Sequence, residues 1–201
     1  MNWKQITLNQ WKQLEEISDR EYEDDILKTA DIISVVYGID NPMDLTPAEF
    51  SKRVKELGFL EEQIPETKLC NTYTINGTKY NFDGNCFSMT MSQLMDWRAF
   101  STAERIDYAS CLSVFLVPEG HKYNDGYDID KTIDDINTLP ITDVMKIYSF
   151  WSAGFSLFTS TLTDYFNRQM KNLKLSPAQR AEMRNNLNQL NEILTTYSPT
   201  L

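Results

Sequence analysis

The chain has 201 residues, 41% of them hydrophobic and 24% charged, with a net charge of −10 and an isoelectric point near 4.6. This hydrophobic content disfavours intrinsic disorder, and the acidic surplus argues against general nucleic-acid binding, which needs Lys and Arg to displace phosphate counterions. The charge is uneven: residues 1–66 carry 7 basic and 15 acidic side chains, a net of −8, whereas residues 165–201 carry 5 and 2, a net of +3.

The N-terminal part of the chain predicts three helices. A Ser or Thr followed three residues later by Glu or Gln forms a capping box, in which each side chain satisfies a backbone N–H at the helix start. Such pairs occur at Thr7/Gln10 and Thr46/Glu49. We expect helices over about 8–17, 23–37 and 47–57, with Gly38 ending the second and Gly58 the third.

Residues 72–82 predict a β-hairpin. Asn76-Gly77 lies between two β-prone runs, and both residues tolerate the positive φ angles that a tight hairpin turn requires. Apolar and aromatic residues alternate with polar ones on either side of this turn. Because an isolated two-stranded ribbon is only marginally stable, we expect one face of the hairpin to pack on helices or on a partner.

Helical signals resume after the hairpin. The pairs Thr90/Gln93 and Ser101/Glu104 have the capping-box spacing and predict helices over about 91–99 and 102–115, the second ended by Pro118. A polar loop follows, and then a short helix beginning near Asp130.

Residues 140–172 predict a long central helix, about 50 Å in length at 1.5 Å per residue. One row of apolar and aromatic residues has the alternating three- and four-residue spacing of a heptad pattern: Ile141, Val144, Tyr148, Trp151, Phe155, Phe158, Leu162 and Tyr165. A second row consists of Ile147, Phe150, Gly154, Leu157 and Thr161. A helix that is apolar on several sides is expected to be surrounded by protein, although part of either row could form a groove for a partner helix.

The uncharged stretch from Ile147 to Thr163 is too short and too rich in Ser and Thr for a typical membrane span, which favours a buried core helix. The first residues, Met-Asn-Trp-Lys, do not have the form of a secretion signal. Cys70, Cys86 and Cys111 show no paired spacing, so we expect reduced thiols and neither a disulfide framework nor a zinc site. Together these features predict a soluble, intracellular protein.

A last amphipathic helix is predicted over 177–195, after the capping box Ser176/Gln179. We therefore expect a helical domain with a small β-hairpin insertion over 1–175, and a C-terminal amphipathic helix and tail over 176–201. The narrow apolar stripe of this helix is predicted to bind a partner, and it consists of Met183, Leu187, Leu190 and Leu194. The alternative is that the helix folds back on the acidic N-terminal helices of its own chain.

The best candidate for site chemistry is the acidic loop at 124–130, because clustered carboxylates can bind Ca²⁺. Its glycine and glutamate positions do not fit the EF-hand pattern, so turn formation and helix capping explain its Asp residues better. The only histidine, His121, has no nucleophile at a recognised spacing. We therefore expect no catalytic residues, no metal and no cofactor.

Four segments carry a family resemblance: ITLNQW at 6–11, INGTKY at 75–80, MTMSQLMD at 89–96 and FLVPEGHKYNDGY at 115–127. In these segments the chain resembles small virion-morphogenesis proteins of tailed bacteriophages, in particular those of crAss-like phages. Similar proteins are often regarded as tail-assembly-chaperone-like, and such chaperones are helical and acidic and shield apolar segments of tape-measure or tube proteins.

The resemblance implies a non-enzymatic assembly protein that acts in the host cytoplasm on tape-measure, tail-tube or head–tail proteins, and that could form a homo-oligomer. It implies no catalytic residues, and no nucleic-acid or membrane partner. The alternative is a structural virion subunit, at the head–tail junction or packaged in the particle. An enzyme with an unrecognised site is the remaining reading.

Overall fold

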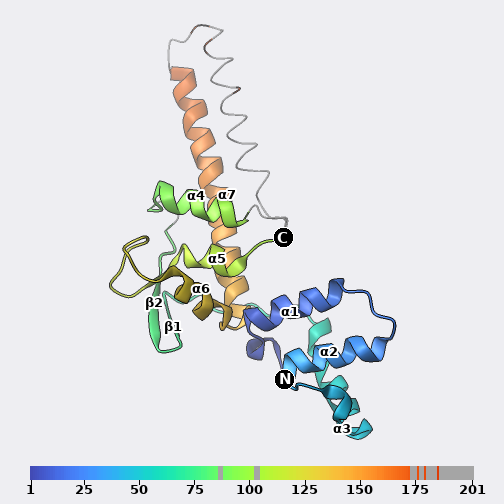
Figure 1. The fold of residues 1–201 in the computed structure, drawn as a ribbon. Helices are drawn as coiled ribbons and strands as arrows, with labels where there is room; N and C mark the ends of the chain where they lie inside the picture. The colour runs from blue at the N-terminus through green and yellow to red at the C-terminus, as the bar shows by residue number, and fades with distance from the viewer. Residues whose placement is uncertain (86–87, 102–104, 173–175, 177–178, 180–184, 186–201) are drawn as a thin grey trace.

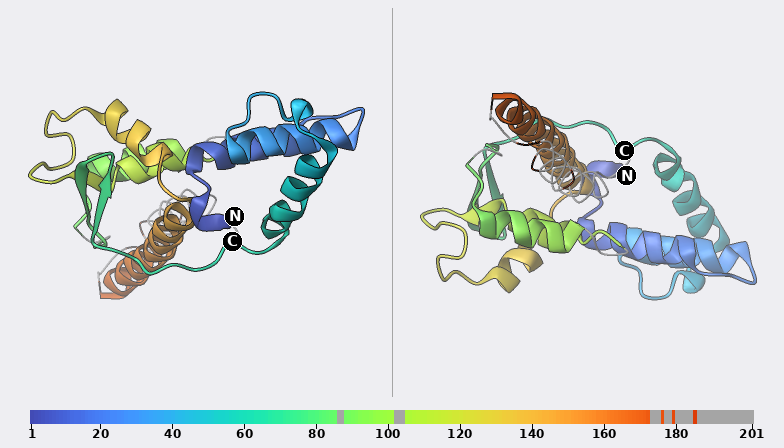
Figure 2. Two further views of the ribbon diagram at one scale, coloured as in Figure 1. Left: turned by 90° about the horizontal axis from the view of Figure 1, so that it is seen from below. Right: turned by 90° about the horizontal axis from the view of Figure 1, so that it is seen from above.

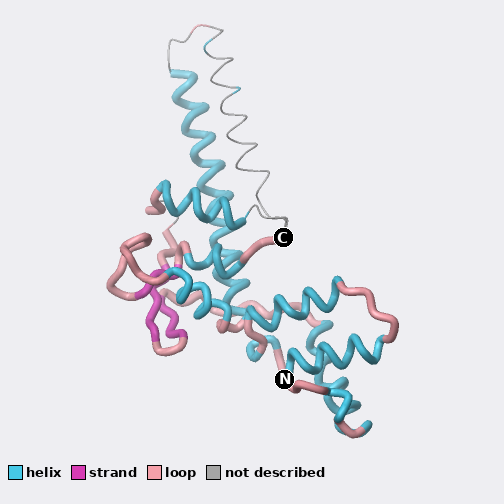
Figure 3. The backbone as a smooth tube through the Cα atoms, in the orientation of Figure 1, coloured by secondary structure: helices cyan, strands magenta, loops and turns pink. Residues whose placement is uncertain are grey.

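A computed structural model describes residues 1–85, 88–101 and 105–172, together with Ser176, Gln179 and Asn185. Within these residues the chain is mainly helical, with a small antiparallel sheet, as the sequence predicts (Figures 1 and 3). The α-helices are α1 (Leu8–Asp19), α2 (Asp25–Tyr37), α3 (Pro47–Glu56), α4 (Met91–Ser101), α5 (Tyr108–Ser113), α6 (Ile129–Asn137) and α7 (Ile141–Asn172). The short 3-10 helices are η1 (Trp3–Gln5), η2 (Pro42–Asp44) and η3 (Leu57–Glu61).

Helices α1, α2 and α3 form a lobe on one side of the molecule (Figure 1). The capping box predicted at Thr7 is confirmed: the Gln10 amide donates to Thr7 Oγ1 at 3.2 Å, and the Thr7 amide donates to Gln10 Oε1 at 3.0 Å. Gly38 caps α2 with φ 64°, as predicted. The role predicted for Gly58 is wrong, because α3 ends at Glu56 and the chain continues through Gly58 as η3.

A short antiparallel contact ties this lobe to the start of α7. The Leu8 amide donates to the Leu139 carbonyl at 2.9 Å, and the Ile141 amide donates to the Ile6 carbonyl at 2.8 Å. Ile6 and Leu8 are fully buried, so these bonds form inside the core. Figure 2 shows that the helical lobe and the sheet lie on opposite sides of the first turns of α7.

The sheet has three antiparallel strands in the order β1 (Thr72–Ile75), β2 (Thr78–Phe82) and β3 (Leu116–Pro118). The predicted hairpin is confirmed, with Asn76 at φ 49° and Gly77 at φ 81° in its turn. Strand β3 was not predicted from the sequence. It pairs with β2 through Phe82↔Leu116 and gives the hairpin a third strand.

The helix predicted over 102–115 is wrong in extent. Helix α5 begins after Asp107, whose side chain accepts from the Ser110 amide, and β3 follows soon after its end. The Ser101 hydroxyl lies at the end of α4, where it donates to the Arg98 carbonyl at 3.3 Å. Ser101 therefore belongs to the end of one helix and not to the start of the next; Glu104 lies outside the described residues.

The first half of α7 runs through the core. Its heptad row is buried from Ile141 to Phe155, and Trp151 stacks on Phe115 with ring centroids 3.7 Å apart. The expectation that protein surrounds the helix is wrong for part of its second row: Ile147 is buried, but Phe150 is 39% exposed and Leu157 is 60% exposed. The described residues include no helix with the length and apolar character needed to span a bilayer.

Candidate functional site

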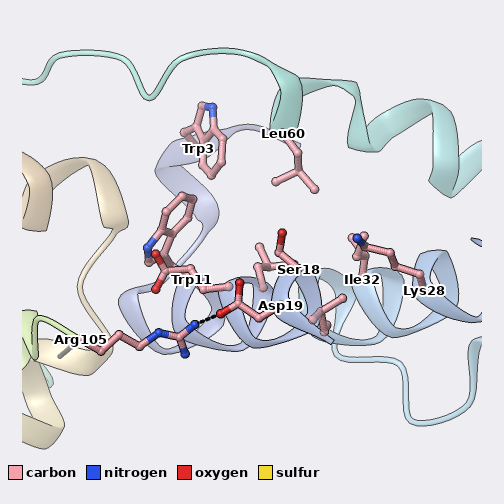
Figure 4. A pocket seen from close by; sticks show the side chains of 11 residues that line it. Trp3, Trp11, Ser18, Asp19, Lys28, Ile32, Leu60 and Arg105 are labelled. Atoms are coloured by element: carbon pink, nitrogen blue, oxygen red, sulfur yellow. Dashed lines mark hydrogen bonds and ion pairs between the residues drawn. The ribbon is translucent and has the colours of Figure 1, made fainter. Parts of the chain in front are cut away.

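A pocket of about 460 Å³ opens in the N-terminal lobe, between α1, α2, η1 and η3 (Figure 4). Trp3 and Trp11 lie at one end of it, and Lys28 and Ile32 of α2 lie at the other. Its apolar lining includes Leu14, Ile17, Ile32 and Leu60. The volume is within the range of about 300–1,000 Å³ found for ligand pockets.

The aromatic end of the pocket is fixed by packing and one hydrogen bond. Trp3 and Trp11 meet edge to face with ring centroids 5.6 Å apart, and Trp3 meets Phe59 in the same way at 5.3 Å. The Trp3 indole N–H donates to the Glu62 carbonyl at 3.1 Å. These contacts place two indoles from different elements, η1 and α1, at one end of the same cavity.

Charged side chains border the pocket. Asp19 and Arg105 form an ion pair between the end of α1 and the segment that precedes α5 (Figure 4). Glu15, one turn earlier on α1, also lines the pocket and has no ion pair among the described residues. Burial raises the pKa of Glu15, and the Arg105 guanidinium and the Trp11 indole act in the opposite direction without cancelling that effect.

A second candidate surface is the outer row of α7, which we define as Phe150, Gly154 and Leu157. These residues follow one another at intervals of four and three, which keeps them on one side of the helix. Beyond Leu157 this side becomes polar at Thr161, which is exposed. The outer row is therefore a short apolar stretch on a helix whose other side forms the core.

Helix α4 exposes two methionines, Met91 at 70% and Met95 at 58%. They are four residues apart and thus share one side of the helix, whereas Trp97 is buried and packs on Phe155 of α7 at 4.6 Å. Methionine is common at adaptable binding surfaces. The heptad pattern indicated a possible binding surface on α7, whereas the surface on α4 was not predicted.

The predicted partner-binding residues lie outside the described part of the chain; they are Met183, Leu187, Leu190 and Leu194. The capping box predicted in front of them is present, because the Gln179 amide donates to Ser176 Oγ at 3.3 Å and the Ser176 amide donates to Gln179 Oε1 at 3.0 Å. Gln179 and Asn185 are helical. The partner-binding role of the stripe stays a prediction, and so does the domain division at 175/176.

The acidic loop has the role in turns and caps that the sequence favours. Asp128 caps α6 by accepting from the Lys131 amide at 3.0 Å. Asn124 and Gly126 take positive φ angles of 61° and 76° in the turn before it. In the part of the chain that the structure describes, no three His, Cys, Asp or Glu side chains are grouped as metal ligands would be.

The pocket was not predicted from the sequence. Its lining comes from five separate segments, and no motif joins them. The available signal was local: two of the four tryptophans fall within the first 11 residues, beside an acidic helix. Since tryptophan is highly buried on average, such a pair indicates core packing more than a cavity. The cavity is therefore apparent only in the folded structure.

Comparisons with protein-family models, curated proteins and solved structures give no match to this chain.

Proposed function

We propose that this chain is a non-enzymatic assembly protein of a tailed bacteriophage, which binds tail or tape-measure components through the outer row of α7. The observation that carries the proposal is the exposure of Phe150 and Leu157 on a helix whose opposite side is buried from Ile141 to Phe155. Burial of apolar surface is the main driving force of protein association. A row this narrow suits a single partner helix.

The position of the row supports the proposal. Helix α7 continues to Asn172, and in Figure 1 it extends past α4 and away from the other described elements. Gly154, at the centre of the row, has no side chain to hold a second helix away. A partner helix could therefore approach closely between Phe150 and Leu157.

The occupant that fits is an amphipathic helix, because the outer row is a narrow apolar stretch on one side of α7. The resemblance described above implies apolar segments of tape-measure or tube proteins as the clients. The phage role rests on that resemblance and on the acidic, helical composition. An acidic surface also keeps a protein with exposed apolar side chains from self-association.

The test is co-expression of the chain with the tape-measure and tail-tube proteins of the same genome, followed by co-purification. Leu157→Asp should abolish capture because it places a charge in the row, whereas Leu157→Met should retain it. Val54→Asp is the matched control, because Val54 is an exposed apolar residue on α3. Equal capture by Leu157→Asp, with unchanged circular dichroism, would remove the outer row from the proposal.

The second candidate function, a structural subunit of the virion, is favoured by the same exposed row, because apolar surface can be covered permanently in a particle. Quantitative mass spectrometry of purified particles separates the two. An assembly factor is absent or far below one copy per structural repeat, whereas a subunit is present in stoichiometric amount.

A further inference from the structure

The pocket of the N-terminal lobe contains a carboxylate that its surroundings compensate only in part: the Arg105 guanidinium and the Trp11 indole act to lower the pKa of Glu15 without cancelling the effect of its burial. Glu15 is half-buried on α1, and among the described residues no Lys or Arg lies within 4.0 Å of its carboxylate. The neighbouring Asp19 is already paired with Arg105. Partial removal of a carboxylate from water is costly unless a cation or hydrogen-bond donor compensates it.

The same end of the cavity holds two indole rings. Indole is the side chain that attracts cations most strongly through its ring face, and the attraction grows when the pair is shielded from water. Trp3 and Trp11 come from η1 and α1 and line the cavity together with Glu15. Aromatic rings beside a carboxylate form the kind of environment that accepts an organic cation with an aliphatic stem.

The charge of the lobe favours a cationic ligand as well. Residues 1–66 carry 15 acidic and 7 basic side chains, a net of −8. This surplus attracts basic segments before contact and raises their association rate. Lys28 lines the opposite end of the pocket, on α2, and Arg105, on the side of Trp11, is paired with Asp19 (Figure 4).

We propose that this pocket binds a Lys or Arg side chain of a partner protein, with the cationic group at Glu15 and the aliphatic stem against Trp3 and Trp11. The cavity of about 460 Å³ exceeds the volume of one such side chain, and Ile32 and Leu60 line the remainder. An adjacent apolar residue of the same partner segment fills that space. The proposal rests on a protein-binding role, but it concerns a surface separate from the outer row of α7.

The experiment follows the four indole N–H resonances of the full chain by NMR during titration with the blocked dipeptide acetyl-Leu-Lys-amide. We expect saturable shifts of the Trp3 and Trp11 resonances, and constant Trp97 and Trp151 resonances. Acetyl-Leu-Arg-amide should act in the same way. The norleucine counterpart, which keeps the stem and lacks the charge, should bind at least tenfold more weakly. Equal binding of the norleucine dipeptide, or no shift with any dipeptide, overturns the proposal.

Two variants and one amine locate the interaction. Glu15→Gln should weaken binding of the lysine dipeptide roughly tenfold, the effect of losing about 1.4 kcal/mol of charge pairing. Glu16→Gln makes the same change on the exposed adjacent residue and should leave binding unchanged. If Glu15→Gln binds like the unmodified chain, the carboxylate has no such role. If n-butylammonium binds as tightly as the dipeptide, the ligand is a free amine and the assignment to a partner protein is wrong.

The two binding proposals fail separately. Leu157→Asp alters α7 alone and should leave the dipeptide titration unchanged, because Leu157 is not among the residues that line the pocket. If Leu157→Asp loses client capture and keeps dipeptide binding, the outer row is supported independently of the pocket. If Glu15→Gln loses dipeptide binding and keeps client capture, the pocket is supported independently of the outer row.

Discussion

The Tyr80 hydroxyl donates a 2.5 Å hydrogen bond to Asp135 Oδ2, which joins strand β2 to helix α6 across 55 residues of sequence. Asp135 is only 5% exposed, and it also accepts from Lys131 Nζ at 2.7 Å and from Asn76 Nδ2 at 2.9 Å. Burial acts to raise the pKa of Asp135, but the hydrogen bonds from Lys131, Tyr80 and Asn76 hold it below its ordinary value. The hairpin is therefore fixed to α6 through one ionised carboxylate.

Replacement of this carboxylate should destabilise the fold. Asp135→Asn leaves the buried Tyr80 hydroxyl with a weaker acceptor and removes the partner of Lys131, for an expected loss of about 2–3 kcal/mol in the free energy of unfolding. Urea denaturation at pH 7 measures it. Asp134→Asn, on the exposed adjacent residue, is the control and should change stability by less than about 0.5 kcal/mol.

The same carboxylate predicts a pH dependence. Because its folded pKa lies below the unfolded value, its stabilisation is fully present above the unfolded pKa and is lost as the pH falls through the folded pKa. The stability difference between the unmodified chain and Asp135→Asn should therefore shrink in acid. A difference that stays constant from pH 7 to pH 3 would contradict an ionised Asp135.

Deletion of the core aromatics of α7 should also be costly. Trp151 is 3% exposed and stacks on Phe115, and Phe155 is 4% exposed and packs on Trp97. Trp151→Ala or Phe155→Ala should each lower the free energy of unfolding by about 3–5 kcal/mol, because each leaves a cavity. Leu157→Ala is the control on the exposed side and should cost far less. An unchanged denaturation midpoint for both aromatic variants would place their row at the surface.

The acidic loop is predicted to bind no structural metal. An ion that binds only the folded state raises the Tm by mass action. Since we expect no such ion, titration with Ca²⁺ or Mg²⁺ should leave the Tm unchanged. The capping role of Asp128 gives its carboxylate a partner, the Lys131 amide. A rise in Tm that disappears in Asp125→Asn and Asp128→Asn would instead locate an ion in this loop.

The C-terminal stripe gives a prediction that the sequence alone supplies. We expect the double variant Leu187→Asp, Leu190→Asp to keep its circular dichroism spectrum and to lose co-purification with the neighbouring structural proteins. A narrow apolar stripe suits one partner helix better than a broad core. Collapse of the fold would assign the stripe to the core of this chain. Survival of both fold and partner binding would leave the stripe with neither role.

Local chemistry determined the elements that the sequence predicted correctly. The Thr7 and Thr46 capping boxes, Gly38 and Asn76-Gly77 each act through neighbouring backbone groups, so a few adjacent residues suffice to place them. The buried part of the heptad row of α7, from Ile141 to Phe155, was found in the same way, from the spacing of its residues. In contrast, the spacing of Ser101 and Glu104 predicted a helix start at a point where α4 ends. The next helix, α5, is capped by Asp107 instead.

The tertiary structure alone decided which residues meet across long separations. Strand β3 is three residues long and forms a strand by pairing with β2. Nothing in the local sequence distinguishes Asp135 from the neighbouring Asp residues, and its role comes from the hydrogen bond that Tyr80 donates to it. The exposure of Leu157 and the position of Glu15 in a pocket depend on how the other elements pack, which residue spacing does not reveal. Periodicity identifies the apolar sides of a helix, whereas the packing of the whole chain determines which of those sides remain open to a partner.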